Sequence, residues 1–388
     1  MGNGREICKL GDLVDLYSGG TPNKSILEYW DGSIPWISAK SMYEDFLSSS
    51  DLYISEAGLR AGSRLAKKGS ILLLTRGSGL FNRIPVCWTL SDVAFNQDVK
   101  NIKSKDEGIV MSQYLFYWLY AHKSDISAIL ETTGIGAGKI DTERLLSMSV
   151  LLPGISEQEQ IIRAIKPFFD IISLNNRINH NLEEQAQALY KSWFIDFEPF
   201  KNGKFVNSDL GLIPKGWRIG KLSDLLEVRY GKDHKSLKDG ETPVYGSGGL
   251  MRYAERALYD GESVLIPRKG TLNNVMYVHD AFWTVDTMFY TVERVSNVIK
   301  YCHLFLLTQD LASMNSGSAV PSMTTDILNN LPLLIPTDDV IKEFNQIVSA
   351  SYEIRKKKEN ESSFLSQSRD AILPQLMTGQ LKNTFLNC

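Results

Sequence analysis

Residues 156–194 read SEQEQIIRAIKPFFDIISLNNRINHNLEEQAQALYKSWF, and this stretch decides the fold. Its apolar side chains recur every three or four residues, the spacing of one face of an α-helix. Ser156 and Glu159 have the spacing of a capping box, so we expect the helix to begin there. Pro167 lacks the amide that would bond to residue 163, which predicts a kink or a fresh start. The stripe comprises Ile161, Ile165, Phe168, Ile172, Asn175, Asn179, Leu182, Ala186, Leu189 and Trp193.

A second stripe of the same kind lies near the end of the sequence. Both stripes are mainly apolar at their ends and polar in the middle. This pattern predicts two long antiparallel helices that pack against each other, with a polar centre that fixes their register. The alternative is a pair of ordinary core helices in separate domains, but the stripes run far beyond the mean helix of about 11 to 12 residues. The second stripe comprises Val340, Phe344, Ile347, Ser351, Ile354, Lys358, Glu361, Leu365, Ser368, Ile372 and Leu376.

The chain also contains an internal repeat. The sequence KLGDL at 9–13 returns as KLSDL at 221–225, and Gly69 and Arg76 return as Gly261 and Arg268. From Gly134 to Phe194 the offset stays constant, so that Gly134 corresponds to Gly317. Loops change length easily, whereas a long packed helix does not. We therefore predict two copies of a globular part followed by a rigid helical part.

The globular parts combine short strands with helices. Apolar runs rich in branched residues lie between clusters of Gly, Ser and Asn, which predicts strands joined by long loops. The stretch 113–120 predicts a helix, and the linker 198–216 contains turn residues throughout. The predicted strands are 71–75, 264–267, 275–278 and 285–292.

Together these patterns predict an α+β fold. Two globular mixed α/β domains are separated by two long antiparallel, coiled-coil-like helices, and the whole is a pseudo-twofold internal repeat. The expected parts are an N-terminal domain at 1–155, a central helix at 156–198, a linker and second domain at 199–338, a C-terminal helix at 339–380 and a tail at 381–388.

Composition narrows the class of protein. Of the 388 residues, 43% are hydrophobic and 22% are charged, which is typical of globular proteins and excludes disordered and fibrous chains. No apolar run approaches the 18 residues of a membrane span, and the first 20 residues do not resemble a signal peptide, so we expect a cytoplasmic protein. The four cysteines show no metal-ligand spacing, and the neighbours Cys302 and His303 point in different directions, so we expect free thiols and no metal.

The charge distribution bears on nucleic-acid binding. The net charge is −3, and no segment is strongly basic, so a nucleic-acid surface would have to be a local patch. Arg60, Arg64, Lys67 and Lys68 have helical spacing, and the tract 215–238 holds seven basic and three acidic residues. Either could follow phosphates, or could equally be a solvated helix face or strand edge. The run 355–358, which is entirely basic, favours a solvated face over a nucleic-acid clamp.

Two arginines are better candidates because they recur at the ends of corresponding strands. Arg76 is followed by Gly77 and Ser78, and Arg268 by Lys269, Gly270 and Thr271. An arginine with a nearby hydroxyl can fork onto a guanine edge or a phosphate. The alternative is an arginine paired with a structural carboxylate.

Motifs for catalysis are missing from the sequence. There is no Gly-x-Ser-x-Gly elbow, His-Glu-x-x-His, calcium loop or Asn-Pro-Pro-aromatic tetrad. The segment 134–139, GIGAGK, differs from a phosphate loop because residue 133 is threonine and Lys139 is followed by isoleucine. We interpret it as a glycine turn. The histidines at 122, 180, 234, 279 and 303 are dispersed.

Several motifs resemble those of the specificity subunits of type I DNA restriction and modification systems, over essentially the whole chain. The most specific are SWFIDFEPF at 192–200 and GLIPKGW at 211–217. The resemblance implies two target-recognition domains, each reading one half of a split DNA sequence. It also implies that two modification (methyltransferase) subunits dock on the helical regions and that restriction (endonuclease and translocase) subunits join them. S-adenosylmethionine, ATP and magnesium would be handled by these partners, and this chain would bind no cofactor.

The leading hypothesis is therefore a non-catalytic, sequence-specific subunit that binds double-stranded DNA. Family recognition domains diverge where they read bases, so the predicted contacts do not come from a motif. An alternative is a coiled-coil scaffold whose globular heads bind a partner other than DNA. A self-sufficient modification enzyme is disfavoured by the missing tetrad. The residues predicted to lie near DNA are Lys40, Ser41, Arg76, Ser78, Ser247, Arg268 and Lys269.

Overall fold

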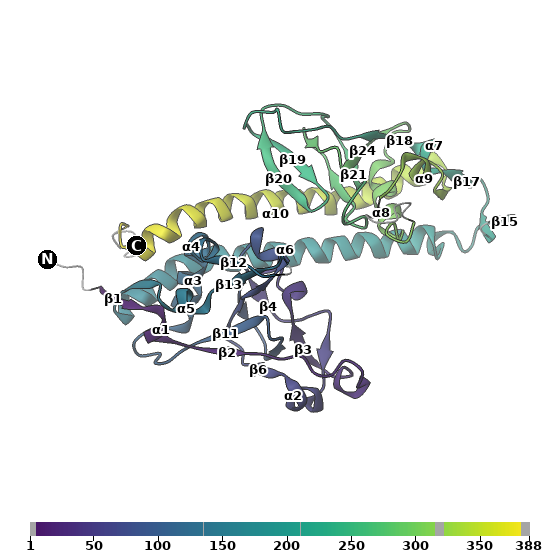
Figure 1. Ribbon diagram of the computed structural model, residues 1–388. Helices are drawn as coiled ribbons and strands as arrows, with labels where there is room; N and C mark the ends of the chain where they lie inside the picture. Colours follow the sequence, from purple (N-terminus) through teal and green to yellow (C-terminus); the bar gives the residue numbers. More distant parts are fainter. Residues whose placement is uncertain (1–4, 135, 210, 315–321, 382–388) are drawn as a thin grey trace. The chain divides into compact units, whose positions relative to one another are not determined.

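The computed structural model describes residues 5–134, 136–209, 211–314 and 322–381. The chain divides into two compact units. Unit 1 comprises residues 1–177 and 359–388, and unit 2 comprises residues 178–358. Two long helices, α6 (Ile155–Phe194) and α10 (Asp338–Thr378), each contribute one segment to each unit (Figure 1).

Unit 1 contains two larger sheets and two smaller ones. The five-stranded sheet has the order β2 (Val14–Ser18), β11 (Val99–Ser104), β7 (Ile71–Leu74), β9 (Val86–Thr89), β4 (Phe46–Leu47). The four-stranded sheet has the order β5 (Tyr53–Ile54), β3 (Ile34–Ile37), β10 (Val93–Phe95), β6 (Arg64–Ala66). The smaller sheets are β1 (Glu6–Lys9) with β14 (Ser149–Leu152), and β12 (Leu130–Thr132), β13 (Gly138–Ile140), β8 (Arg76–Gly77).

Unit 2 contains a shorter version of the same arrangement. One sheet has the order β18 (Leu226–Tyr230), β24 (Met288–Glu293), β21 (Ser263–Pro267), β22 (Met276–Val278), and another has β20 (Gly249–Ala254), β19 (Thr242–Gly246), β23 (Trp283–Thr284). The smaller pairs are β17 (Arg218–Lys221) with β25 (Pro332–Ile335), and β15 (Phe205–Ser208) with β16 (Gly211–Pro214). The predicted strands at 71–75, 264–267 and 275–278 are present, whereas the strand predicted at 285–292 begins only at Met288. The linker is not turn throughout, because β15 and β16 form a hairpin within it.

The two units repeat one order of elements, which confirms the internal repeat. The KLGDL and KLSDL motifs form α1 (Leu10–Leu13) and α7 (Leu222–Leu225). In each, the carboxylate of the motif's aspartate accepts a hydrogen bond from the amide of its lysine, at 3.2 Å. The pairs α5 (Thr142–Leu146) and α9 (Thr325–Asn329), β14 and β25, and α6 and α10 keep the constant offset. The turn predicted at Gly317 lies outside the described residues.

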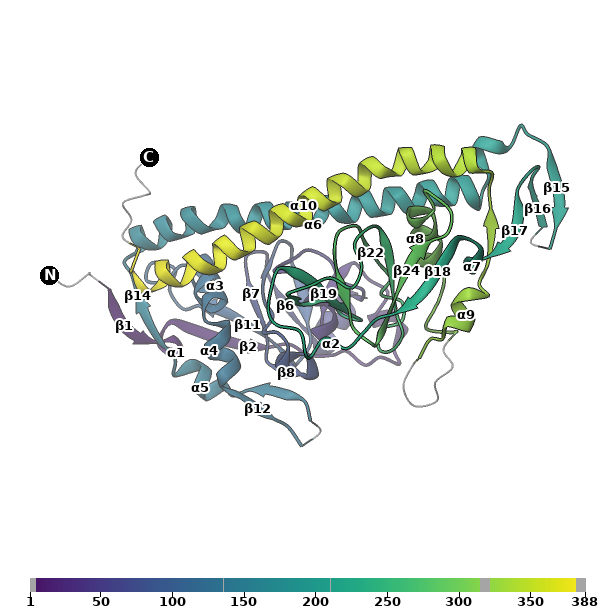
Figure 2. The ribbon, with the colours of Figure 1, turned by 90° about the horizontal axis from the view of Figure 1, so that it is seen from above.

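An apolar helix covers a sheet in each unit. The predicted helix at 113–120 is α3 (Ser112–Ala121), which packs on β9 and β11, and its counterpart α8 (Ile299–Leu307) packs on β21 and β22 (Figure 2). Six of the ten residues of α3 and eight of the nine residues of α8 are buried. The remaining helices of the described chain are short: α2 (Glu56–Gly62), α4 (Lys123–Ala128) and the 3-10 turns η1 (Leu27–Tyr29), η2 (Ala39–Ser41), η3 (Ser78–Phe81) and η4 (Glu198–Phe200).

The repeat extends to a tight backbone crossing after β2 and β18. A Cβ atom on Gly19 would lie 2.0 Å from the Phe95 carbonyl oxygen, and one on Gly231 would lie 2.0 Å from that of Val285. Only glycine fits at such a distance. The indoles of Trp36 and Trp283 then donate to the carbonyls of the residues that follow these glycines, at 3.1 and 2.9 Å.

The start of α6 differs from the prediction. The helix begins at Ile155, and the carbonyl of Gly154 accepts from the amides at 157 and 158, so Ser156 lies inside the first turn and is not the cap. The helix then runs through Pro167 without restarting, so the fresh start is wrong, and the kink expected as its alternative stays a prediction. Burial of Ile165 and Phe169 on either side of the proline offsets the missing hydrogen bond.

The segments of α6 and α10 pack antiparallel within each unit. In unit 1 the buried amide of Asn175 donates to Glu361 at 3.0 Å and to Ser362 at 3.2 Å. In unit 2 Arg355 pairs with Glu183 at 3.4 Å. The polar middles of both stripes thus contact each other, as predicted, and a buried polar pair of this kind fixes helix register.

The buried face of α10 that the second stripe predicts is only partly correct. Ile347 and Ile354, predicted to face the partner helix, are exposed, whereas Ile341, Val348 and Tyr352 are buried. The helix packs on the α/β part of its unit as well as on α6, and this second contact rotates the buried face. Helical spacing alone does not separate the two contacts. In the described part of the chain, no helix is long and apolar enough to cross a membrane.

Candidate nucleic-acid interface

In unit 1, the predicted residues leave from neighbouring strand ends. The amide of Asn96 donates to the Ile37 carbonyl at the end of β3, at 3.0 Å. The amide of Thr75, at the end of β7, donates to the Asp98 carbonyl at 2.8 Å. The loop 96–98 therefore links the two strand ends, from which η2 and β8 begin. Lys40 on η2 and Arg76 on β8 are both exposed.

The pairing of β8 adds a cation that the sequence did not suggest. Arg76 lies opposite Lys139 of β13 in antiparallel register, and Glu131 of β12 lies opposite Lys139 on its other side. Like charges directly opposite each other destabilise a sheet, because their side chains lie on one face about 5 Å apart. A phosphate placed over Arg76 and Lys139 would remove this repulsion. Lys139 belongs to the glycine-rich segment that is not a phosphate loop, and only the strand pairing brings it to Arg76.

The two serines of this surface differ. The Ser41 hydroxyl shares a hydrogen bond of 2.8 Å with that of Ser50, which donates to the Trp36 carbonyl at 2.7 Å. Ser41 is therefore part of a chain of bonds that holds η2 on β3. Ser78 is exposed at the start of η3 and is available to a ligand.

The corresponding surface of unit 2 follows β21. The amides of Arg268 and Lys269 both donate to the Thr287 carbonyl, at 2.8 and 3.2 Å. The Arg268 guanidinium donates to the Asp286 carbonyl at 3.1 Å and lies 5.4 Å from the ring centre of Tyr230. The alternative for these arginines was a salt bridge with a structural carboxylate. Within the described residues neither Arg268 nor Arg76 forms such a salt bridge.

Ser247 lies against the same segment. The Asn274 amide donates to the Ser247 carbonyl at 2.8 Å, and a Cβ atom on Gly270 would lie 2.8 Å from the Ser247 hydroxyl. The structure thus brings Ser247 next to Arg268 and Lys269. Lys269 is exposed and pairs through its backbone with Ser322.

The other basic candidates have structural roles. Arg60 lies in the last turn of α2, Arg64 lies in β6 and Lys67 follows β6, so these residues do not share a helix face, and their predicted stripe is wrong. A change from helix to strand between them breaks the spacing. Lys67 pairs with Asp92 at 2.7 Å.

The remaining two tracts are also partly neutralised. In the tract 215–238, Arg218 pairs with Asp224 at 3.0 Å and Arg229 with Glu227 at 2.7 Å. Lys356, in the run 355–358, pairs with Asp280 at 2.8 Å. Neither tract presents an uninterrupted row of cations.

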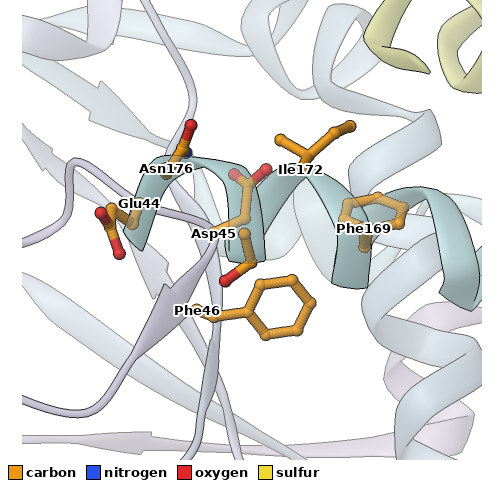
Figure 3. A pocket seen from close by; sticks show the side chains of 7 residues that line it. Glu44, Asp45, Phe46, Phe169, Ile172 and Asn176 are labelled. Atoms are coloured by element: carbon orange, nitrogen blue, oxygen red, sulfur yellow. The ribbon is translucent and has the colours of Figure 1, made fainter. Parts of the chain in front are cut away.

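A cluster of largely buried charged side chains joins the α/β part of unit 1 to its helical segments. Asp45 lies 3.7 Å from Lys123 and 3.8 Å from Arg369 of α10. Burial lowers the pKa of Lys123 to about 8, although the Asp45 carboxylate opposes this shift. Asp45 and Phe46 face Phe169 of α6 across a small pocket (Figure 3). The pocket measures about 20 Å³, which is room for about one water molecule.

Unit 2 has a larger pocket of about 360 Å³. It is lined mainly by polar side chains, including Glu262, Glu293 and Lys300, and Lys300 donates to Glu262 at 2.7 Å. Burial raises the pKa of Glu293. Glu293 ends β24, whereas Met288 begins it beside Pro267, so the pocket lies at the opposite end of the strand from Arg268.

The described residues contain no group of three or more His, Cys, Asp or Glu side chains that could hold a metal ion. Cys8, Cys87 and Cys302 are free thiols, and Cys388 lies outside the described residues. His303 is buried, and its Nδ1 atom lies 2.7 Å from the Tyr352 hydroxyl. The two surfaces after β7 and β21 carry guanidinium, ammonium and hydroxyl groups, which can form hydrogen bonds with phosphates and base edges.

Comparison with known proteins supports this reading. The family described as type I restriction modification DNA specificity domain matches residues 3–184 and 214–361. The MjaIX type I restriction enzyme specificity subunit of Methanocaldococcus jannaschii is 28% identical, over 97% of this chain and 93% of its own. The EcoR124I/EcoR124II specificity subunit of Escherichia coli is 31% identical, over 47% of this chain and 45% of its own. The S subunit of a type I restriction-modification system from M. genitalium has a similar fold, with a TM-score of 0.55 at 14% identity over 96% of each chain.

Proposed function

Because this chain belongs to the family of type I restriction modification DNA specificity domains, we propose that it reads a bipartite DNA site, one half through each unit. Unit 1 would contact DNA through Lys40, Ser41, Arg76 and Ser78, and unit 2 through Ser247, Arg268 and Lys269. The observation that carries the proposal is the repeat itself. Corresponding strands, β7 and β21, are each followed by an exposed cationic segment whose arginine has no carboxylate partner within the described residues.

The low net charge is compatible with this role. A net charge of −3 gives little general attraction to DNA, so affinity has to come from local cations and from partner subunits. Arg76 and Lys139 in unit 1, and Arg268 and Lys269 in unit 2, are such local pairs. Their hydrogen-bonding groups can contact both phosphates and guanine edges.

The partners follow from the same proposal. Two methyltransferase subunits would dock on the helical regions, and restriction subunits would join them in the cytoplasm. Support comes from exposed apolar side chains on the helices: Ile171, Leu174 and Phe364 in unit 1, and Ile347 and Ile354 in unit 2. S-adenosylmethionine, ATP and magnesium would belong to the partners. The recognition domains would span 1–155 and 199–338, and the helical regions 156–198 and 339–380.

The chain itself would be non-catalytic, since its sequence lacks the tetrad used for methyl transfer to an amino group. Co-expression with the matching methyltransferase subunit tests the whole proposal. The expected result is a complex that methylates genomic DNA at a split sequence, whereas neither protein alone does so. A complex that forms but protects no DNA would indicate a scaffold, and methyl transfer by the isolated chain would indicate an enzyme.

A matched variant sharpens this test. Arg76→Ala removes an unpaired cation from the surface after β7, and Lys67→Ala removes a cation from unit 1 that is already paired with Asp92. We expect the first variant to change the level or pattern of methylation and the second to leave both unchanged. Equal effects of the two variants would contradict the assignment of that surface.

A further inference from the structure

The hairpin of β19 and β20 contains a bulge that turns two large apolar side chains outward. Val244 pairs with Arg252 and Tyr245 pairs with Leu250, so Met251 has no partner on β19. In a regular strand the side chains of two successive residues point to opposite faces of the sheet, so one of the two would be buried. Here Leu250 is 50% exposed and Met251 is 55% exposed. Bulges redirect side chains and are common beside functional sites.

The tip of this hairpin is shaped around Met251. A Cβ atom on Gly246 would lie 2.5 Å from the Met251 sulfur, so the methionine lies across a backbone that has no side chain. The turn at Gly248 is open. Within the described chain, and leaving out the two residues next to it, no heavy atom would lie within 4 Å of a Cβ atom placed on Gly248. Beyond Tyr245, the last residue of β19 that pairs with β23, the hairpin is a two-stranded ribbon with these apolar side chains at its base.

Cations lie beside the hairpin. Ser247, at its turn, contacts the segment that follows β21, because its carbonyl accepts from Asn274 and its hydroxyl lies against Gly270. That segment carries Arg268 and Lys269. The exposed ring of Tyr230 lies under the Arg268 guanidinium. An apolar hairpin beside cations fits a partner with an anionic outer surface and a groove that contains apolar groups.

We propose that Met251, supported by Leu250, contacts a thymine methyl group in the major groove of the half-site that unit 2 reads. The major groove admits a two-stranded β-ribbon, and the C5-methyl of thymine is the apolar group that base edges present there. Phosphates on either side of the groove would meet Arg268 and Lys269. The inference rests on the proposed function and adds to it a residue that determines specificity.

Deoxyuridine provides the test, because it differs from thymidine only by that methyl group. The recognition sequence of the full complex with its methyltransferase subunits is first mapped by sequencing methylated DNA. Affinity is then measured for duplexes in which single thymines are replaced by uracil. We expect one replacement, in the half-site of unit 2, to weaken wild-type binding by about fourfold, the equivalent of one buried methyl group.

Variants identify the side chain responsible. Met251→Ala should bind the thymine duplex about as weakly as the wild type binds the uracil duplex, and should not distinguish the two. Met251→Leu keeps an apolar side chain over Gly246 and should retain most of the discrimination. Leu212→Ala, which removes an exposed apolar side chain from the other hairpin of unit 2, at β16, is the matched control and should retain all of it.

The outcomes separate the inference from the proposed function. A wild-type complex that binds no specific sequence would overturn the proposed function. Specific binding with no thymine in the unit 2 half-site, or with no sensitivity to uracil, would overturn the thymine contact alone. So would a uracil effect that persists unchanged in Met251→Ala, because another side chain would then contact the methyl group.

Discussion

Replacing Arg369 with alanine should destabilise unit 1 and leave unit 2 unchanged. The Arg369 side chain is only 6% exposed, and its guanidinium lies 4.6 Å from the ring centre of Tyr120 and 4.8 Å from that of Phe169. It is also 3.8 Å from Asp45. These contacts tie the last third of α10 to α3 and α6.

The size of the effect follows from these contacts. A desolvated cation over an aromatic ring contributes about 1 to 2 kcal/mol, so two rings account for about 2 to 4 kcal/mol. Asp45 keeps Lys123 at 3.7 Å after the substitution, and Asp370, which also loses the arginine, is 59% exposed, so no buried carboxylate is left unpaired. The total loss should be about 3 kcal/mol, and Arg369→Met, which keeps the apolar stem, should lose about 2 kcal/mol.

Hydrogen exchange resolved by peptide is the suitable assay, because a chain of two compact units has no single unfolding midpoint. A loss of about 3 kcal/mol should accelerate exchange in α3 by about 100-fold, since each tenfold corresponds to about 1.4 kcal/mol. Exchange in α8, which belongs to unit 2, should not change. Asp370→Ala is the control, because Asp370 pairs with the same arginine but is 59% exposed and should contribute less than about 1 kcal/mol. Equal acceleration in the two variants, or in both helices, would refute the reasoning.

Three further predictions concern titration and close packing. Burial lowers the pKa of His303 to about 3, so the folded imidazole stays neutral where the unfolded one takes up a proton. The stability of unit 2 should therefore fall as pH decreases from about 6.5 towards 3, and His303→Gln should reduce this fall in peptide-resolved hydrogen exchange of α8 at pH 7 and pH 5. Lys123, with its pKa lowered to about 8, releases its proton in the folded state before the unfolded chain does. The free energy of unfolding of unit 1 should therefore rise between pH 8 and about 9.5, by up to about 1.4 kcal/mol per pH unit relative to Lys123→Met. Parallel pH profiles of the wild type and the variant would contradict this. Gly19→Ala and Gly231→Ala should each destabilise their own unit by more than about 2 kcal/mol in peptide-resolved exchange, whereas Gly79→Ala, which has open space, should not.

The sequence predicted the correspondence between the two halves of the chain, although it did not predict α5 and α9 as helices. A constant offset is visible without structure, and α5, α9 and the starts of α6 and α10 follow it. The apolar spacing of 156–194 likewise predicts a long helix, because one face packs on a partner throughout. The cap was misplaced, since Gly154 precedes the helix where Ser156 was expected to, and the fresh start expected at Pro167 does not occur.

What the sequence did not predict depends on contacts between distant segments. Lys139 joins Arg76 only because β13 pairs with β8, and a strand of two residues carries no signal of its partner. The exposed Ile347 belongs to a helix that packs on two surfaces, so its spacing fits either face. Met251 faces solvent because of a bulge, which reverses the alternation that a strand pattern implies.

The central claim is that each unit reads one half of a split site, and binding to half-scrambled duplexes tests it most directly. The complex of the full chain with its methyltransferase subunits is titrated in a band-shift assay with the mapped site and with versions in which one half is scrambled. Arg76→Ala should lose discrimination for one half only, and Arg268→Ala for the other half only. If both variants lost the same affinity for every duplex, the two arginines would be general phosphate contacts, and the division of reading between the units would be contradicted.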